Sequence, residues 1–139
     1  MSKDEDLQKY MILLEQYKEQ ISQLEMQSQY LQAAAMDYGK AKITLENLSK
    51  TDDGTETLIP IGGGAFVYAS LENTSKVLID IGSDLVAEKN FEDAIKKIDA
   101  KLEELQKNQD KLNAMMEQFQ AEAIDISAKA QKIANEQQK

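Results

Sequence analysis

Residues 56–95 read ETLIPIGGGAFVYASLENTSKVLIDIGSDLVAEKNFEDAI, a stretch dense in β-branched and other apolar residues. Turn-forming residues divide it at the glycine run 62–64, at the polar run 72–75 and at Gly82-Ser83-Asp84. This pattern predicts two β-hairpins in succession. The predicted strands are residues 56–61, 65–71, 76–81 and 85–87. Pro60 cannot donate to a strand ladder, so we expect an edge or a bulge at that position of the first strand.

The predicted strands carry more apolar side chains than two small hairpins can cover by themselves. At about 25 cal/mol per Å² of buried apolar area, leaving several of them in water forfeits several kcal/mol. We therefore predict that the strands pair with other subunits, in an oligomer from which the helices project. The predicted oligomerisation residues are Leu58, Ile59, Ile61, Phe66, Val67, Tyr68, Val77, Leu78, Ile79 and Ile81.

The segments before and after the strands show a heptad repeat, with apolar residues at alternating spacings of three and four. In the first segment the predicted seam is Leu7, Tyr10, Leu14, Tyr17, Ile21, Leu24, Ser28, Leu31, Ala35, Tyr38, Lys42 and Leu45. In the second it is Ile95, Ile98, Leu102, Leu105, Gln109, Leu112, Met116, Phe119, Ala123, Ile126, Ala130 and Ile133. Only Ser28, Lys42 and Gln109 interrupt these seams with polar side chains. The repeat predicts two coiled-coil helices, each about 70 Å long.

Two helices of equal length on one chain can bury both seams by folding back on each other. We therefore expect an α+β fold, a long antiparallel two-helix coiled coil joined by a four-stranded, two-hairpin β connector. The predicted facing pairs are Leu7 with Ile133, Leu14 with Ile126, Ile21 with Phe119 and Leu45 with Ile95. Asn90, followed by Asp93, resembles a capping box at the start of the second helix. The expected organisation is a single domain, 1–139, with helices at 3–50 and 90–137 and the oligomerising hairpins at 55–88.

The order of helix, four strands and helix resembles the alpha class of prefoldin subunits of the archaeal type. In that family an ET-x-x-PIG strand and a glycine turn precede KV-x-x-x-IG and a helix-opening E-K. The residues that match this pattern are Glu56, Thr57, Pro60, Gly62, Gly64, Lys76, Val77, Gly82, Glu88 and Lys89. The likeness is specific over about 40 residues, and the flanking coils match in pattern rather than identity.

The resemblance implies a hetero-hexamer of two alpha-class and four beta-class subunits, in which the hairpins form a double β-barrel platform that carries coiled-coil tentacles. It implies an ATP-independent holdase that captures unfolded polypeptides between the tentacles and transfers them to a group II chaperonin. Two hairpins indicate the alpha class, since beta-class subunits have one. Gamma-type subunits share this topology, so a structural subunit of a homo-oligomeric or filamentous assembly is the alternative.

The run Tyr10-Met11-Ile12-Leu13-Leu14 is apolar on every helical face, although the seam requires only Tyr10 and Leu14. An exposed apolar patch suits a surface that binds many clients, and methionine adapts to different shapes. Packing against a neighbouring coil would explain the run equally well. The predicted client-binding residues at the tip are Tyr10, Met11, Ile12, Leu13, Ile124, Ile126 and Ile133.

Composition argues against several other functions. The chain has no histidine, no cysteine and 16 basic residues that are all lysine, with a net charge of -9, which disfavours nucleic acid. Glycines 62–64 lack the following Gly-Lys-Ser/Thr of a phosphate loop, and Asp52, Asp53 and Glu56 lack the spacing of an EF-hand. Paired carboxylates such as Glu103 and Glu104 are expected on a solvated face. We expect no enzyme activity, cofactor, metal or membrane span, and a cytoplasmic location.

Overall fold

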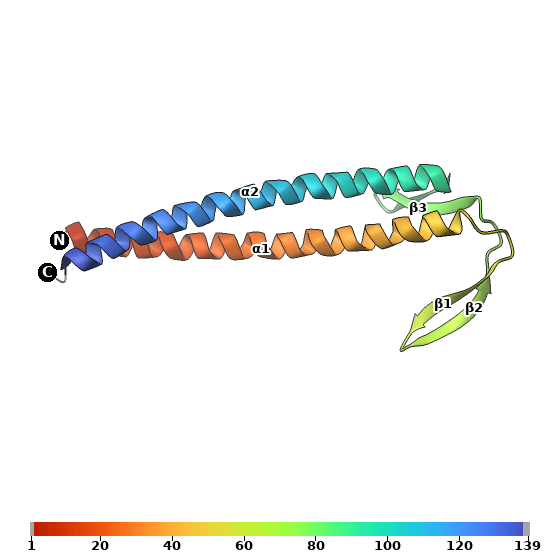
Figure 1. Cartoon of the computed structure of the whole chain (residues 1–139), viewed down its shortest axis with the longest axis horizontal. Coiled ribbons are helices and arrows are strands. Elements are labelled where there is room, and N and C mark those ends of the chain that lie inside the picture. Colours follow the sequence, from red (N-terminus) through yellow and green to blue (C-terminus); the bar gives the residue numbers. More distant parts are fainter. Residues whose placement is uncertain (1, 138–139) are drawn as a thin grey trace. The chain divides into compact units, whose positions relative to one another are not determined.

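The computed structural model describes residues 2–137, which form two long helices and four strands (Figure 1). The element order is α1 (Ser2–Leu48), β1 (Glu56–Gly62), β2 (Ala65–Ser70), β3 (Lys76–Gly82), β4 (Leu85–Asn90) and α2 (Phe91–Gln137). By their contacts these residues divide into two compact units. The terminal unit comprises residues 2–34 and 105–137, and the connector unit comprises residues 35–104. The predicted fold class, two long helices with two antiparallel hairpins, is confirmed.

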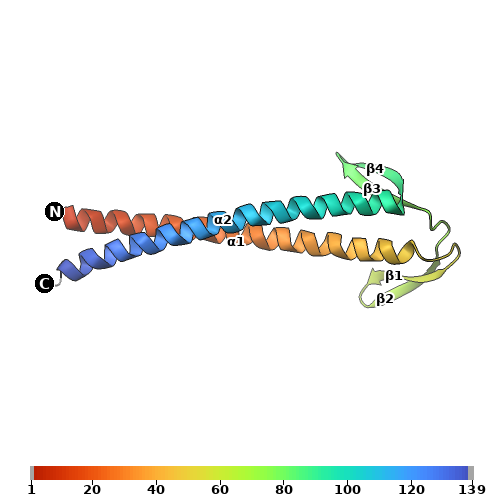
Figure 2. The ribbon, with the colours of Figure 1, turned by 45° about the horizontal axis from the view of Figure 1, so that its top comes forward.

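The heptad seam is confirmed in both helices. Every residue predicted for it is buried or half-buried, and the residues on the outward positions are mostly exposed. In the terminal unit α1 and α2 lie side by side and antiparallel (Figures 1 and 2). Lys3 Nζ lies 3.4 Å from Glu136 Oε2, close to the predicted register. The ring of Phe119 contacts that of Tyr17, with centroids 5.9 Å apart, one turn from its predicted partner Ile21.

A polar layer interrupts the seam of the terminal unit. Gln109 Nε2 donates hydrogen bonds to Ser28 Oγ at 2.7 Å and to Asn113 Oδ1 at 3.0 Å. Ser28 is buried, and Gln109 Oε1 is buried with no hydrogen-bond partner among residues 2–137. A buried polar group without a partner is costly, so this layer is weaker than a leucine layer would be.

We predict that backbone amides around Ser28 and Gln109 exchange hydrogen faster than those around Leu45 and Ile98. Replacing the pair together, Ser28→Ala with Gln109→Leu, removes the unpaired carbonyl and adds buried apolar area. This variant should gain about 1 to 2 kcal/mol in unfolding free energy and exchange more slowly. Gln23→Leu, an exposed change on the same helix, is the control and should have little effect. Uniform protection along the wild-type helices would contradict the prediction.

The connector unit contains the main apolar cluster, formed by Leu45, Phe91, Ala94 and Ile98. Val77 and Ile79 of β3 pack against this cluster, and β3 runs beside the first turns of α2 in both views (Figures 1 and 2). The helix α2 begins where predicted, because Asn90 Oδ1 accepts the backbone N–H of Asp93 at 2.7 Å.

Lys42 lies at a seam position of the connector unit and remains half-exposed. Its Nζ reaches Asp99 Oδ1 at 2.7 Å, and this hydrogen bond and the charge of Asp99 raise the pKa of Lys42. The ammonium group therefore keeps its charge at the edge of the seam, which explains how lysine is tolerated there.

Each hairpin is closed by a two-residue turn with positive φ. In the first, Gly63 and Gly64 have φ of 60° and 75°; in the second, Ser83 and Asp84 have φ of 53° and 60°. Pro60 still pairs with Phe66, and the ladder shifts register after it, before Gly62; the second hairpin shifts in the same way between Asp80 and Gly82, where there is no proline. The fourth strand extends beyond its predicted end at Ala87, because Glu88, Lys89 and Asn90 still pair with β3. Within the described chain, neither hairpin pairs with the other.

A side-chain tether connects the segments that precede and follow the first hairpin. Asp53 Oδ1 accepts hydrogen bonds from the backbone N–H and the hydroxyl of Thr74, both at 2.7 Å. These bonds lower the pKa of Asp53, with the hydroxyl as the largest cause. The stabilisation is therefore fully present above the unfolded-state pKa and is lost as the pH falls through the folded-state pKa.

We predict that Thr74→Ala, which removes only the hydroxyl donor, raises the pKa of Asp53 toward its ordinary value. Titration of the Asp53 carboxyl carbon by NMR measures this directly in both proteins. Ser70→Ala, an exposed hydroxyl of β2, serves as the control. An unchanged midpoint in Thr74→Ala would show that the hydroxyl does not bond the carboxylate.

Candidate functional site

The predicted client-binding residues all lie in the terminal unit, but they are not equally accessible. Met11, Ile12 and Leu13 occupy positions outside the seam, and Met11 and Ile12 are 57% and 60% exposed. Ile124 of α2 is 71% exposed. The remaining three, Tyr10, Ile126 and Ile133, are half-buried seam residues. We refer to Met11, Ile12 and Leu13 as the tip patch. Of the seven predicted residues, Met11, Ile12 and Ile124 present most of their surface to solvent, and Leu13 is 37% exposed.

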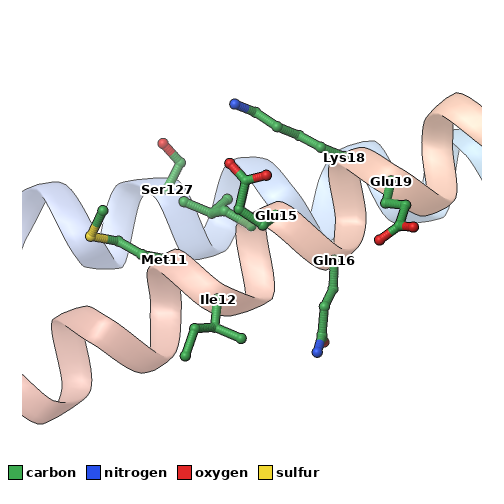
Figure 3. Close-up of a pocket in the computed structure, with 8 residues that line it drawn as sticks. Met11, Ile12, Glu15, Gln16, Lys18, Glu19 and Ser127 are labelled. Atoms are coloured by element: carbon green, nitrogen blue, oxygen red, sulfur yellow. The ribbon is translucent and has the colours of Figure 1, made fainter.

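An open groove on α1 adjoins the tip patch, and we call it the tip groove. Its apolar lining consists of Met11, Ile12 and Leu14. The polar lining consists of Glu15, Gln16, Lys18, Glu19 and, from α2, Ser127. Figure 3 shows Ile12 and Gln16 projecting from one side of the helix and Glu15 and Lys18 from the other. The groove therefore offers a short apolar strip with charged groups at its border, and no deep cavity.

The helix pair beneath the tip groove is held by an aromatic contact. The rings of Tyr17 and Phe119 pack at an angle of 45°. Hydrogen bonding of the Tyr17 hydroxyl to Glu122, with burial and the negative charge of Glu122, raises the pKa of Tyr17. The tyrosine therefore stays neutral and donates to Glu122, which joins α1 to α2 a short distance from the tip patch.

The β1–β2 hairpin is apolar on both faces, and both faces are exposed. Antiparallel pairing aligns Leu58 with Tyr68 and Pro60 with Phe66, which places these four side chains on one face. Ile59 and Val67 form the opposite face. Tyr68 is 80% exposed, and in Figure 1 this hairpin stands apart from the helices of the connector unit. A two-stranded ribbon of this kind is marginal alone and gains stability when partners cover both faces.

The β3–β4 hairpin differs because its own subunit covers one face. Val77 and Ile79, predicted as oligomerisation residues, pack against the apolar cluster of the connector unit. Leu78, on the other face, is 70% exposed. The other predicted oligomerisation residues, in β1, β2 and the end of β3, are exposed: Leu58, Ile59, Ile61, Phe66, Val67, Tyr68 and Ile81.

The sequence-based list missed several exposed apolar residues. Val86 lies on the same face of the second hairpin as Leu78, and Leu85, beside the turn, lies on the opposite face and is also exposed; strand alternation across residues 85–87 was the available signal. On α1, Met26 and Tyr30 in the terminal unit, and Met36 and Ile43 in the connector unit, are also exposed. Their outward heptad positions could have identified them.

Features of a catalytic or metal site are not found among residues 2–137. No three or more carboxylates gather as metal ligands, and no helix in the described part of the chain is long and apolar enough to span a bilayer.

Comparison with known proteins gives a consistent picture. The model of the family Prefoldin, described as "Prefoldin subunit", matches residues 17–136. The prefoldin subunit alpha of Archaeoglobus fulgidus is 31% identical, over 100% of this chain and 99% of that protein. The prefoldin subunit alpha of Methanosarcina barkeri is 26% identical, over 94% of this chain and 92% of that protein. A solved chain of the filamentous PFD from Methanocaldococcus jannaschii is 24% identical and has a TM-score of 0.61, covering 91% of this chain and 98% of that chain.

Proposed function

The chain belongs to the prefoldin family, whose members are chaperones rather than enzymes, and from this premise we propose that it captures unfolded polypeptides at the tip patch without ATP. The observation that carries the proposal is the exposure of Met11, Ile12 and Leu13. Packing of α1 against α2 explains why the seam residues are apolar. It does not explain why these three residues, which lie outside the seam, are apolar. Large apolar side chains kept in water on a stable helix are typical of a binding surface.

We further propose that the hairpins assemble the subunits. The two bare faces of β1–β2 and the outer face of β3–β4 provide apolar area that this chain alone does not bury. In the proposed assembly two copies combine with four beta-class subunits, and the strands close into a β-barrel platform. Barrel closure would satisfy the open strand edges as well as the apolar faces. Captured clients would then pass to a group II chaperonin.

A homo-oligomeric or filamentous assembly is the second candidate. Its support is the fold shared with the filamentous PFD of Methanocaldococcus jannaschii, a likeness that at 24% identity concerns the fold alone. The two candidates predict different behaviour of the purified chain. A subunit that needs beta-class partners should form discrete particles only when mixed with them, whereas a filament subunit should assemble without limit by itself. Mass measurement of the chain alone and in mixtures separates these outcomes.

The capture function is tested by light scattering from a chemically unfolded client diluted into buffer without nucleotide. The assembled particle should suppress client aggregation at stoichiometric concentrations, and adding ATP should not change the result. A folded coiled-coil protein without an apolar patch is the control for nonspecific crowding. If assembled particles leave aggregation unchanged, the proposed function is wrong.

A further inference from the structure

The border of the tip groove is negatively charged on α1. Residues 4–19 contain five carboxylates, Asp4, Glu5, Asp6, Glu15 and Glu19, against Lys9 and Lys18. All seven side chains are exposed. Of these seven, Glu15, Lys18 and Glu19 line the groove itself, so the flanking residues of a segment bound there must lie close to these three charges.

The helical spacing places two of the carboxylates beside the apolar lining. Glu15 follows Met11 by one turn, and Glu19 follows Ile12 by two turns, so each lies on the same side of α1 as the apolar residue it follows. Both glutamates line the tip groove together with Met11 and Ile12, and Figure 3 shows both on the C-terminal side of these two residues along α1.

Two lysines of the terminal unit are already paired with carboxylates. In the terminal unit, Lys129 lies 3.2 Å from Asp125 and Lys3 lies 3.4 Å from Glu136, so each of these ammonium groups already has a carboxylate partner. Lys18 is the single cation in the groove lining, against Glu15 and Glu19. The groove therefore retains an excess of negative charge at its border.

We propose that the tip groove selects client segments in which apolar side chains are flanked by lysine or arginine, and discriminates against the same segments flanked by aspartate or glutamate. This selectivity rests on the proposed capture function and adds the class of segment that is captured. The apolar side chains occupy the strip of Met11, Ile12 and Leu14, and the flanking cations lie opposite Glu15 and Glu19. Like charges at those positions repel each other across the short distance of a bound segment.

The size of the effect follows from the exposure of the glutamates. An exposed ion pair changes a binding constant by a factor of about 1.5 to 5, so two pairs predict a preference of about twofold to 25-fold. The preference should fall as salt is raised, because the Debye length shortens from about 8 Å at physiological ionic strength to about 3 Å at 1 M.

The experiment uses fluorescent peptides that share one apolar core of leucine and phenylalanine and differ only in their flanks, which are lysine, glutamine or glutamate. Binding to the assembled particle is measured by fluorescence anisotropy at low and high salt. The lysine-flanked peptide should bind about twofold to 25-fold more tightly than the glutamate-flanked one, with glutamine between them. If none of the three binds, the capture proposal itself fails.

The variant Glu15→Gln with Glu19→Gln tests whether these two glutamates of the groove cause the preference for lysine-flanked peptides. It should reduce the ratio of lysine-flanked to glutamate-flanked affinity to near one, while the glutamine-flanked peptide binds as before. The matched control, Glu25→Gln with Glu117→Gln, removes the same charge at exposed positions of the terminal unit. Glu25 lies about 20 Å from Ile12 by helix rise, so the control should keep the wild-type ratio. Equal binding of all three peptides, or an equal loss of preference in the control, would overturn the proposed selectivity and leave capture intact.

Discussion

A folded subunit that cannot assemble is the expected product of replacing one apolar side chain on each face of the β1–β2 hairpin, Ile59→Glu with Phe66→Glu. Both side chains are exposed in the chain itself, at 47% and 58%, so the helices do not depend on them. In an assembly that covers both faces, each carboxylate would be buried against apolar surface, at a cost of at least about 3 kcal/mol. The dissociation constant of the assembly should rise more than about 100-fold.

Size-exclusion chromatography measures the loss of assembly, and circular dichroism measures whether the subunit remains folded. The variant should elute as a small species while keeping the helical signal of the wild type. Gln20→Glu with Gln23→Glu adds the same charge at exposed helix positions and should assemble normally. A variant that still forms particles of wild-type mass would exclude the first hairpin as the assembly surface.

The second hairpin needs a more selective change. Deleting residues 76–87 would remove Val77 and Ile79 from the cluster around Ala94, so a loss of assembly would be mixed with a loss of folding. Leu78→Glu instead alters only the outer face, where the side chain is exposed. The comparison of these two changes separates the part of the hairpin that stabilises the subunit from the part available to partners.

The sequence predicted the seam and the hairpins because both depend on short-range periodicity. A heptad repeat places every third or fourth apolar side chain on one side of a helix, whatever the partner. Alternation along β3 separates Leu78 from Val77 and Ile79 in the same way. It does not say which face meets the helices. Which face of β3 packs on the helices depends on the path of the connector. The sequence therefore places Val77 and Ile79 among the predicted oligomerisation residues, together with residues that are exposed.

Side-chain reach explains the other differences. The predicted facing pairs place Ser28 and Gln109 in neighbouring layers of the seam. The long glutamine side chain crosses to the serine and forms a hydrogen bond. At the tip, spacing assigned Tyr10, Ile126 and Ile133 to the seam, and their half-burial agrees with that assignment. Their separate prediction as client-binding residues depended on position near the helix ends. For these three a client-binding role remains a prediction.

Loss of client capture without loss of assembly is the expected result of replacing the whole tip patch by glutamine, Met11→Gln with Ile12→Gln and Leu13→Gln. Glutamine is a good helix former, and all three positions lie outside the seam, so α1 and its contacts with α2 should persist. The patch belongs to the terminal unit and the hairpins to the connector unit, so the substitutions leave every residue of the hairpins unchanged.

The size of the loss depends on how much of the patch a client covers. Each of these side chains contributes about 1.5 to 3 kcal/mol when fully buried, and partial coverage gives less. In the proposed assembly several subunits bind one client together, and this multivalent binding offsets part of the loss of affinity. We expect the particle concentration needed to suppress aggregation to rise about tenfold or more.

Light scattering from one unfolded client, with wild-type and variant particles at equal concentration, measures this change. Gln20→Ala, Gln23→Ala and Gln27→Ala together form the matched control, with three exposed substitutions on the same helix that leave the apolar patch complete. The control should suppress aggregation as the wild type does. Equal suppression by an intact tip-patch variant would mean that clients bind at other surfaces, such as exposed Met26 and Tyr30 or the partner subunits, and that the run from Met11 to Leu13 packs locally.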